Sequence, residues 1–405
     1  MLYRLEIENF YSIREPQVID LIAGKSADDR PGRLAPIGPG LEEMAPKVIA
    51  FFGPNASGKS NVLKALSFLA WFVRESFTMS PDGMLPYSRF LHSDALSEPT
   101  RLAIFFTGPS DPEKLGQHDK HSCKYAYELV LGGDHNRPQR VISETLKYWT
   151  LETNRPVNLV HRDQNGEIKA HKHFGLAGYH TALERILRTN VSVISTLVQL
   201  RHPIATELWK TSTQFNSNIL TERMDINEDA VTRIYSLNPR LLTALNKEIE
   251  RIDFGIRELQ LLPGANGPIV GLQHSGLNTP LLLGNESHGT RQFIRTFPLI
   301  FDALANGGLA VIDELDISIH PLILPEILSW FHDSKRNPHN AQLWMTAQNP
   351  SLLEDLTKEE IFFCEKDRRG RTSLYGLKNV QAVRRTENYY RKYLSGVYGA
   401  IPKLG

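Results

Sequence analysis

One octapeptide constrains the fold of this chain more than any other feature of its sequence. Residues 53–60 read GPNASGKS and match the pattern G-x-x-x-x-G-K-[S/T] at every fixed position. A short apolar run at 47–52 precedes it, and apolar residues at helical spacing follow it through 60–77. This order predicts a buried strand, a glycine-rich loop and a helix whose first N–H groups bind a phosphate. We therefore expect an α/β protein with a parallel strand at this point.

The octapeptide also assigns chemistry to individual residues. Its glycines let the backbone curl so that N–H groups point at the β-phosphate of a nucleotide, while Lys59 reaches the β- and γ-phosphates. The Ser60 hydroxyl is the predicted ligand of Mg²⁺. The predicted contacts to ATP come from the loop and the start of the helix: Gly53, Pro54, Asn55, Ala56, Ser57, Gly58, Lys59, Ser60 and Asn61.

A second apolar run ends in two carboxylates. Residues 309–312 read LAVI and are followed by Asp313 and Glu314. Such a strand delivers Asp313 to the magnesium shell at the carboxyl end of the sheet, where Glu314 faces the γ-phosphate and polarises the attacking water. Many strands end in acids, so the pattern gains its weight from the phosphate loop. Together the two motifs predict an ATPase that forms ADP and phosphate.

A third motif, Ser287-His288-Gly289, lies ahead of that strand and before a helical segment at 291–305. Ser-x-Gly at a helix start is a second place to bind a phosphate, although a simple helix N-cap is the alternative. The order of the three motifs resembles the ABC-type P-loop ATPases, which include the SMC and Rad-type heads and the OLD-like ATPases. The resemblance implies that Ser287 and Gly289 bind the γ-phosphate of ATP held by a second protomer, in a homo-oligomer that is at least a dimer.

The resemblance also implies the fold, an α/β ABC-type P-loop ATPase head with a mixed sheet. Between the motifs, β-rich segments at 101–106, 125–131 and 144–151 predict a meander, and helical segments follow them. We expect a large α+β insertion between two core lobes. The predicted regions are an N-terminal lobe with the phosphate loop, the insertion, and a C-terminal lobe, which are residues 1–107, 108–279 and 280–405.

Two further stretches carry a narrower resemblance. Residues 313–321, DELDISIHP, are similar to a D-E-L-D-x-S-x-H-P stretch of prokaryotic abortive-infection and OLD-like ATPases. Residues 393–402, YLSGVYGAIP, are similar to the C-terminus of the AbiLi-type abortive-infection ATPases. This resemblance implies a regulatory ATPase of an anti-phage defence system.

One position departs from the family pattern. After a third apolar strand at 342–346, the family usually has a histidine that senses the γ-phosphate, and this chain has Gln348. Glutamine forms hydrogen bonds with a phosphate oxygen or a water, but it cannot become cationic or shuttle a proton. We therefore place Gln348 in the catalytic set with Glu314 and Lys59, and we expect slow hydrolysis.

Charge, cysteine content and hydropathy argue against several other classes. A net charge of +1 gives no global basic field, so nucleic acid binding requires a local patch. The two cysteines, Cys123 and Cys364, are far apart and form no CxxC pair, which argues against a zinc site or a disulfide framework. No apolar run is long enough to span a bilayer, and the first residues do not read as a signal peptide. We expect a cytoplasmic protein without a membrane partner.

Three functions fit these motifs, and we rank them in the following order. The first is a regulatory defence ATPase. The second is a DNA-repair or chromosome-type ATPase that clamps nucleic acid, although no sustained heptad run for coiled-coil arms occurs between Phe77 and Leu281. The third is a transporter subunit, although the chain lacks an L-S-G-G-Q-like signature.

The effector of the first function is expected to be a separate protein. Beyond Asn349 the chain is too short for a further catalytic domain of at least ~100 residues. Neither the tail nor the middle of the chain shows a recognisable cluster of carboxylates or histidines for metal-dependent cleavage. The aromatic and basic tail at 384–398 is the predicted docking site.

Overall fold

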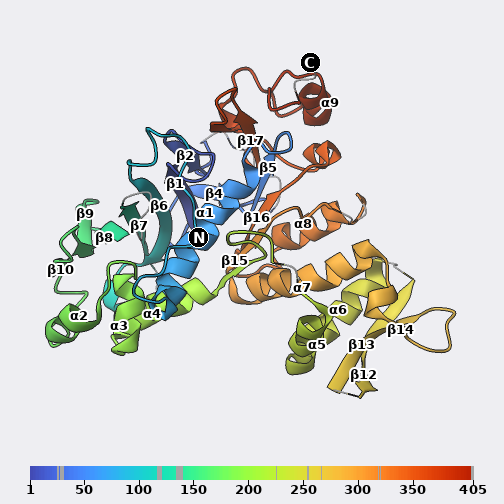
Figure 1. Ribbon diagram of the computed structural model, residues 1–405. Helices are drawn as coiled ribbons and strands as arrows, with labels where there is room; N and C mark the ends of the chain where they lie inside the picture. The colour runs from blue at the N-terminus through green and yellow to red at the C-terminus, as the bar shows by residue number, and fades with distance from the viewer. Residues whose placement is uncertain are drawn as a thin grey trace.

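The computed structural model describes most of the chain: residues 1–24, 27, 32–115, 121–133, 140–224, 226–252, 255–265, 267–317, 319 and 321–402. Ser318 and His320 of the 313–321 stretch lie outside the described residues. Helix α1 (Lys59–Glu75) lies between a six-stranded sheet and a seven-stranded sheet and contacts strands of both (Figure 1).

The six-stranded sheet carries the sequence motifs. Neighbouring strands are parallel except for the last pair, which is an antiparallel hairpin. The carboxyl ends of parallel strands meet at one edge of a sheet, so the loops after them come together there. The sheet confirms the predicted mixed α/β fold, and its strand order is β11 (Phe215–Ser217), β15 (Leu309–Ile312), β16 (Gln342–Thr346), β5 (Val48–Phe52), β17 (Ile361–Lys366) and β18 (Thr372–Gly376).

Strand β5 is buried on both faces, which explains its five successive apolar residues. Ile49 and Phe51 pack into the core that includes α1 and the seven-stranded sheet. Val48, Ala50 and Phe52 pack into a second core on the opposite face, with helices α7 (His288–Asn306) and α8 (Leu324–His332). Side chains alternate along a strand, so an uninterrupted apolar run indicates a strand covered on both sides.

The seven-stranded sheet is antiparallel throughout. Its order is β10 (Ile168–Ala170), β9 (Pro156–Arg162), β8 (Arg140–Trp149), β7 (Ser122–Gly132), β6 (Thr100–Pro109), β1 (Leu2–Glu8) and β2 (Gln17–Asp20). The predicted meander is confirmed by the pairs β6–β7 and β7–β8. Strand β6 crosses the boundary expected at 107/108, and strands on both sides of that boundary belong to this one sheet. A shared sheet neither establishes nor excludes the division into three regions, which stays a prediction.

A buried glutamine joins the two large sheets. Gln342, at the start of β16, accepts a hydrogen bond from the Leu2 N–H (2.9 Å) and donates to the Leu2 carbonyl (3.0 Å). Its amide also donates to the Pro46 carbonyl at 3.2 Å. Because a buried amide without partners destabilises a fold, these bonds hold the first strand of the chain against the central sheet.

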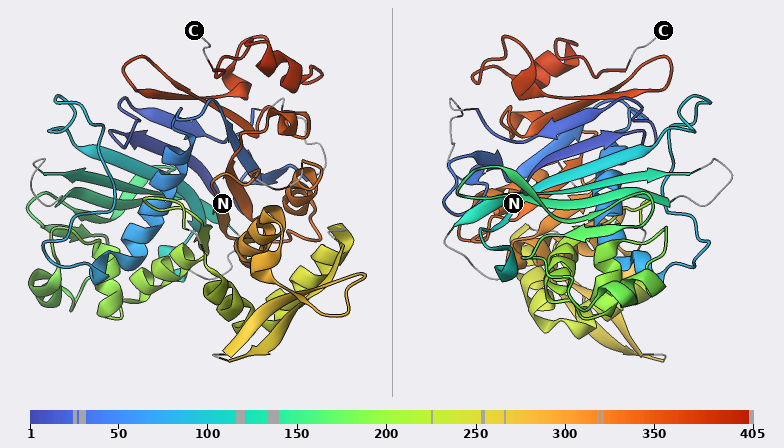
Figure 2. Two further views of the ribbon diagram at one scale, coloured as in Figure 1. Left: turned by 45° about the vertical axis from the view of Figure 1, so that its right-hand side comes forward. Right: turned by 90° about the vertical axis from the view of Figure 1, so that its left-hand side faces the viewer.

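The remaining elements flank this assembly (Figure 2). Helices α3 and α4 pack against α1, and α2 packs against α3. Helices α5 and α6 contact α7 and a small sheet, whose β12–β13 hairpin projects from one end of the molecule. In the part of the chain that the structure describes, no helix is long and apolar enough to cross a membrane. The bounds of these elements and of the others not yet given are α2 (His180–Ile186), α3 (Val193–Gln199), α4 (Pro203–Thr213), α5 (Glu228–Leu237), α6 (Pro239–Ile252), α9 (Tyr389–Leu394), β3 (Leu34–Pro36), β4 (Met44–Pro46), β12 (Ile256–Gly264), β13 (Gly267–His274) and β14 (Leu281–Leu282).

Candidate nucleotide site

The loop between β5 and α1 needs glycine at two positions. Gly53 and Gly58 have φ angles of 148° and 102°, which residues with a side chain rarely adopt. A Cβ atom on Gly53 would lie 2.3 Å from the Cys364 carbonyl oxygen, and one on Gly58 would lie 2.2 Å from Thr372 Oγ1. The two glycines therefore allow the loop to curl and let β17 and β18 approach it closely.

Two distant segments hold the loop in place. Thr372 Oγ1 donates to the Ser57 carbonyl at 2.8 Å, and the Thr372 N–H donates to the Ser12 carbonyl at 2.7 Å. Asn61, in the first turn of α1, donates to Ser12 Oγ at 2.7 Å. The loop conformation thus depends on contacts with both an N-terminal turn and the C-terminal hairpin.

Lys59 is buried at the start of α1, with an exposed fraction of 7%. Its ammonium group donates to the Gly53 carbonyl at 2.7 Å and to the Pro54 carbonyl at 3.0 Å, so the side chain folds back onto the loop. Burial lowers the pKa of Lys59, while the nearby charges of Asp313 and Asp316 act in the opposite direction. The cation therefore lies at the loop that the motif predicts to bind phosphates.

Asp313 meets Ser60 across the edge of the sheet. Asp313 Oδ1 accepts hydrogen bonds from Ser60 Oγ at 2.9 Å and from Thr346 Oγ1 at 2.7 Å. Asn218, at the end of β11, fixes the Asp313 backbone: its amide donates to the Asp313 carbonyl (3.0 Å), and its oxygen accepts from the Asp313 N–H (2.8 Å). A hydroxyl and a carboxylate side by side are the oxygen ligands that Mg²⁺ prefers, so these residues fit the ion.

Glu314 has both carboxylate oxygens engaged. Its backbone is left-handed, with φ of 56°, and its N–H donates to Thr346 Oγ1 at 2.7 Å. Oε1 accepts from the Gln348 amide at 3.1 Å, and Oε2 accepts from Arg223 Nη1 at 2.8 Å. The structure therefore brings the predicted catalytic residues Glu314 and Gln348 into direct contact.

Asp316 links the loops that follow β15 and β16. Its Oδ2 accepts the backbone N–H groups of Gln348 at 2.6 Å and of Asn349 at 2.5 Å. The side chain is buried, so its loss would leave these donors without their acceptor. Asp316 thereby positions Gln348 beside Glu314.

Ser287 and Gly289 lie in a different environment. Ser287 caps α7: its Oγ accepts from the Thr290 N–H at 3.1 Å, and Gly289 is in the first turn of the helix. Among the described residues, no hydrogen bond joins either residue to the phosphate loop. A single protomer thus does not bring the Ser-x-Gly motif into the site, and its role across an interface stays a prediction.

Four residues of the site received no role from the sequence: Asn218, Arg223, Thr346 and Asp316. Asp316 lies within the 313–321 stretch, and Thr346 ends the third apolar strand, so closeness to predicted motifs was the signal for both. Asn218 and Arg223 gave no local signal, because strand order alone places them beside Asp313 and Glu314.

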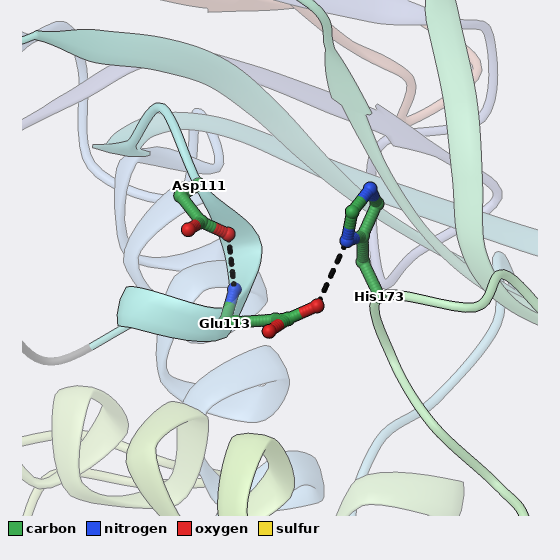
Figure 3. Close-up of side chains that lie close together, drawn as sticks. All are labelled: Asp111, Glu113 and His173. Carbon is green, nitrogen blue, oxygen red and sulfur yellow. Dashed lines mark hydrogen bonds and ion pairs between the residues drawn. The ribbon is translucent and has the colours of Figure 1, made fainter.

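A second group of ionisable side chains lies in the middle of the chain (Figure 3). Single ligand atoms of Asp111, Glu113 and His173 lie within 4.8 Å of one another. The sequence gives no signal for this group, because Glu113 and His173 are 60 residues apart. Asp111 accepts from the Glu113 N–H at 3.0 Å, and Glu113 pairs with His173 at 2.9 Å. A turn cap and an ion pair explain these contacts.

The predicted docking tail differs from expectation. Tyr389, Tyr393 and Tyr398 are buried, and the Tyr393 ring stacks on Phe363 of β17 with centroids 5.4 Å apart. Arg385 pairs with Glu359 at 2.6 Å. These three aromatic side chains therefore complete the core beside β17. Arg384, Arg391, Leu394 and Val397 of the tail are exposed, and the docking role of the tail stays a prediction.

Comparison with known proteins places the chain in a family. Residues 48–97 and 189–354, more than half of the chain, match the family model AAA_21, described as "AAA domain, putative AbiEii toxin, Type IV TA system". The matched ranges include the phosphate loop, the Ser-x-Gly motif and the Asp313-Glu314 pair. No curated protein sequence matches the chain.

Solved SMC heads share low similarity with the chain. The SMC head domain from Thermotoga maritima is 15% identical, with 93% of this chain and 98% of that chain covered and a TM-score of 0.42. An SmcHead bound to the C-winged helix domain of ScpA is 12% identical, with 92% and 96% covered and a TM-score of 0.48. A Pyrococcus furiosus Smc head domain with an extended coiled coil, bound to the C-terminal domain of ScpA, is 12% identical, with 98% and 100% covered and a TM-score of 0.44.

The family match carries the assignment, and it agrees with a parallel sheet that brings a phosphate loop and an Asp-Glu strand end together. The chain belongs to the AAA_21 family of P-loop ATPases.

Proposed function

We propose that this protein binds Mg-ATP at the 53–60 loop and hydrolyses it to ADP and phosphate. The observation that carries the proposal is the 2.9 Å hydrogen bond between Ser60 Oγ and Asp313 Oδ1. These residues are 253 positions apart in sequence; Ser60 ends the phosphate-loop motif, and Asp313 begins the Asp-Glu pair. Their contact supports one composite site rather than two unrelated patterns.

The roles of the residues follow from their chemistry. Lys59 binds β- and γ-phosphate oxygens, and Ser60 and Asp313 hold Mg²⁺, which neutralises phosphate charge when bound. Glu314 accepts a hydrogen bond from the attacking water and polarises it. Gln348 is neutral at every pH at which the protein is folded, so it orients Glu314 or the water without supplying a proton. Hydrolysis is therefore slow, and ATP acts mainly as a switch.

The proposal extends to assembly. Ser287 and Gly289 complete the site of a second protomer, so that ATP joins two copies of the chain. The position of the Ser-x-Gly motif at the N-terminus of α7, where backbone N–H groups are available to an anion, supports this arrangement. The assembled protein regulates a separate effector in an AbiLi-type or OLD-like abortive-infection system. The family description, which names an AbiEii toxin and a Type IV TA system, supports a defence role.

Turnover by the purified protein tests assembly directly. Turnover per chain should rise with protein concentration and then reach a plateau. Lys59→Ala and Ser287→Ala should each be inactive alone, and their mixture should recover at most one complete site per dimer. Concentration-independent turnover by a demonstrated monomer would refute the proposal that two protomers share each site.

A second experiment tests whether the effector is separate. Purified protein with ATP, Mg²⁺ or Mn²⁺ and either DNA or RNA should show no cleavage, and its expression alone should not arrest host growth. The family description contains the word toxin, so the experiment distinguishes a toxic activity of this chain from one of a separate protein. Cleavage or growth arrest that disappears in a point mutant of this chain would place the effector within it.

A further inference from the structure

Arg223 contacts the carboxylate that we propose to act on water. Its Nη1 lies 2.8 Å from Glu314 Oε2, and the two side chains are 31% and 32% exposed. An ion pair this exposed contributes little to fold stability. The importance of the pair lies in its position, since it places a guanidinium group at the edge of the sheet where Ser60, Asp313 and Glu314 meet.

The turn that carries Arg223 is attached to the site. Asn218 forms two hydrogen bonds with the Asp313 backbone, directly before Glu314. The Met224 N–H donates to the Asn218 carbonyl at 2.7 Å, and Ile219 pairs with Arg223 in an antiparallel bridge. Residues 218–224 are thus a closed turn fixed to the residue that precedes Glu314. Its geometry keeps the guanidinium within reach of that carboxylate.

Both oxygens of Glu314 have partners in this arrangement, Arg223 on one side and the Gln348 amide on the other. A carboxylate oxygen that already accepts a hydrogen bond is less available to accept one from a water molecule. Efficient polarisation of water by Glu314 therefore requires that Arg223 find another acceptor.

The substrate supplies such an acceptor. A guanidinium group presents a planar fork of donors that matches phosphate oxygens, and only one of its five N–H groups contacts an acceptor among the described residues. In the proposed function, which this inference deepens, the γ-phosphate lies on the Glu314 side of the loop. ADP lacks that phosphate. We propose that Arg223 exchanges Glu314 for the γ-phosphate of ATP, so that one movement distinguishes ATP from ADP and frees the catalytic carboxylate.

Nucleotide affinities test the exchange. Titration calorimetry would measure binding of Mg-ADP and of an ATP analogue with a non-hydrolysable β–γ bridge to the full chain. Arg223→Ala should weaken analogue binding about tenfold and leave ADP binding unchanged, since one charge-assisted contact is lost for the γ-phosphate alone. Arg223→Lys keeps the positive charge but not the planar fork of donors, so its affinity for the ATP analogue should fall by less than that of Arg223→Ala.

A control variant separates this effect from the loss of any partly exposed ion pair. Arg251 pairs with Glu326 at 2.5 Å with similar exposed fractions of 38% and 35%. Arg251→Ala should change neither affinity. An equal loss of both nucleotides in Arg223→Ala, or no loss of either, would overturn the exchange.

Glu314→Gln provides an independent test. A neutral amide holds the guanidinium less firmly, so this variant should bind the ATP analogue severalfold more tightly than the wild type. The gain should vanish when Arg223→Ala is added, and a gain that survives would contradict the inference. A wild-type protein that binds neither nucleotide would overturn the proposed function as well. A wild type that binds both, with an unchanged preference in Arg223→Ala, would overturn this inference alone.

Discussion

The two sides of the nucleotide site are built in different ways. The phosphate-loop side consists of consecutive residues between β5 and α1, and its shape comes from glycines and from backbone that curls locally. On the carboxylate side, three side chains from two other segments hold Asp313 and Glu314: Asn218 after β11, and Thr346 and Gln348 at the end of β16. The motif of one side therefore lies in a short stretch of chain, which Ser12 and Thr372 hold in place, whereas the other side exists only after the strands have paired.

This difference separates two functions. The loop side presents a cation and backbone donors, so substitutions there should act on nucleotide affinity. The carboxylate side presents groups that act on Mg²⁺ and water, so substitutions there should act mainly on turnover, apart from changes to the Arg223–Glu314 pair, which should also shift ATP affinity. The following predictions test the separation, from the largest expected effect to the smallest.

Lys59→Ala should abolish Mg-ATP binding, a loss of at least about a hundredfold, because the contacts proposed between its ammonium group and two phosphates are charge-assisted. Calorimetry measures the affinity, and circular dichroism checks the fold. Lys210→Ala, which removes an exposed lysine on α4, should bind ATP normally. Retained affinity in Lys59→Ala would mean that the loop is not the main binding element.

Glu314→Gln should retain nucleotide binding and reduce turnover by about a hundredfold or more, since the neutral amide no longer polarises water. Phosphate release at saturating ATP is the measurement. Unchanged hydrolysis would remove Glu314 from its proposed role. A matching loss of affinity would break the separation between the two sides.

The residues that support each side should follow the same division. Asn218→Ala removes two bonds to the Asp313 backbone, so we expect about a tenfold loss of turnover with nearly normal affinity. Thr372→Val removes the bond to the Ser57 carbonyl and should instead weaken binding severalfold. Each change should lower the free energy of unfolding by about 1–3 kcal/mol, measured by urea denaturation. The comparison would be contradicted if Asn218→Ala weakened nucleotide binding while turnover stayed normal, or if Thr372→Val lowered turnover while binding stayed normal.

Gln348→His should give the smallest change, a severalfold rise in turnover with little change in affinity. A histidine adds a group that can carry charge or a proton near the γ-phosphate. Its backbone position should persist, because Asp316 accepts the N–H of residue 348 whatever the side chain is. No change, or a loss of turnover, would show that glutamine does not limit hydrolysis.

The same contrast explains which features could be predicted from sequence. The phosphate loop was predictable because its geometry requires glycines and a lysine in consecutive positions. Strand β15 was predictable because four apolar residues precede two acids. Arg223 and Asn218 were not predictable, since only the pairing of β11 with β15 brings them to Glu314 and Asp313.

The tail shows the limit of local patterns. The aromatic and basic pattern at 384–398 predicted a docking site, but the Tyr393 and Tyr398 rings pack on Phe363, a contact that depends on tertiary structure. Burial of these rings could not be predicted from the spacing of the residues alone.

Strand β5 also has a consequence for synthesis of the protein. Its neighbours in the sheet are β16 and β17, which leave the ribosome roughly 290 residues or more after it. At typical elongation rates, this delay is about 15–60 s. During that time a strand of five apolar residues has neither of its final hydrogen-bonding partners, and such segments readily bind other chains. Nascent chains that stop before β16 should therefore depend on chaperones, and the loop proposed to bind ATP directly follows the strand that waits for its partners.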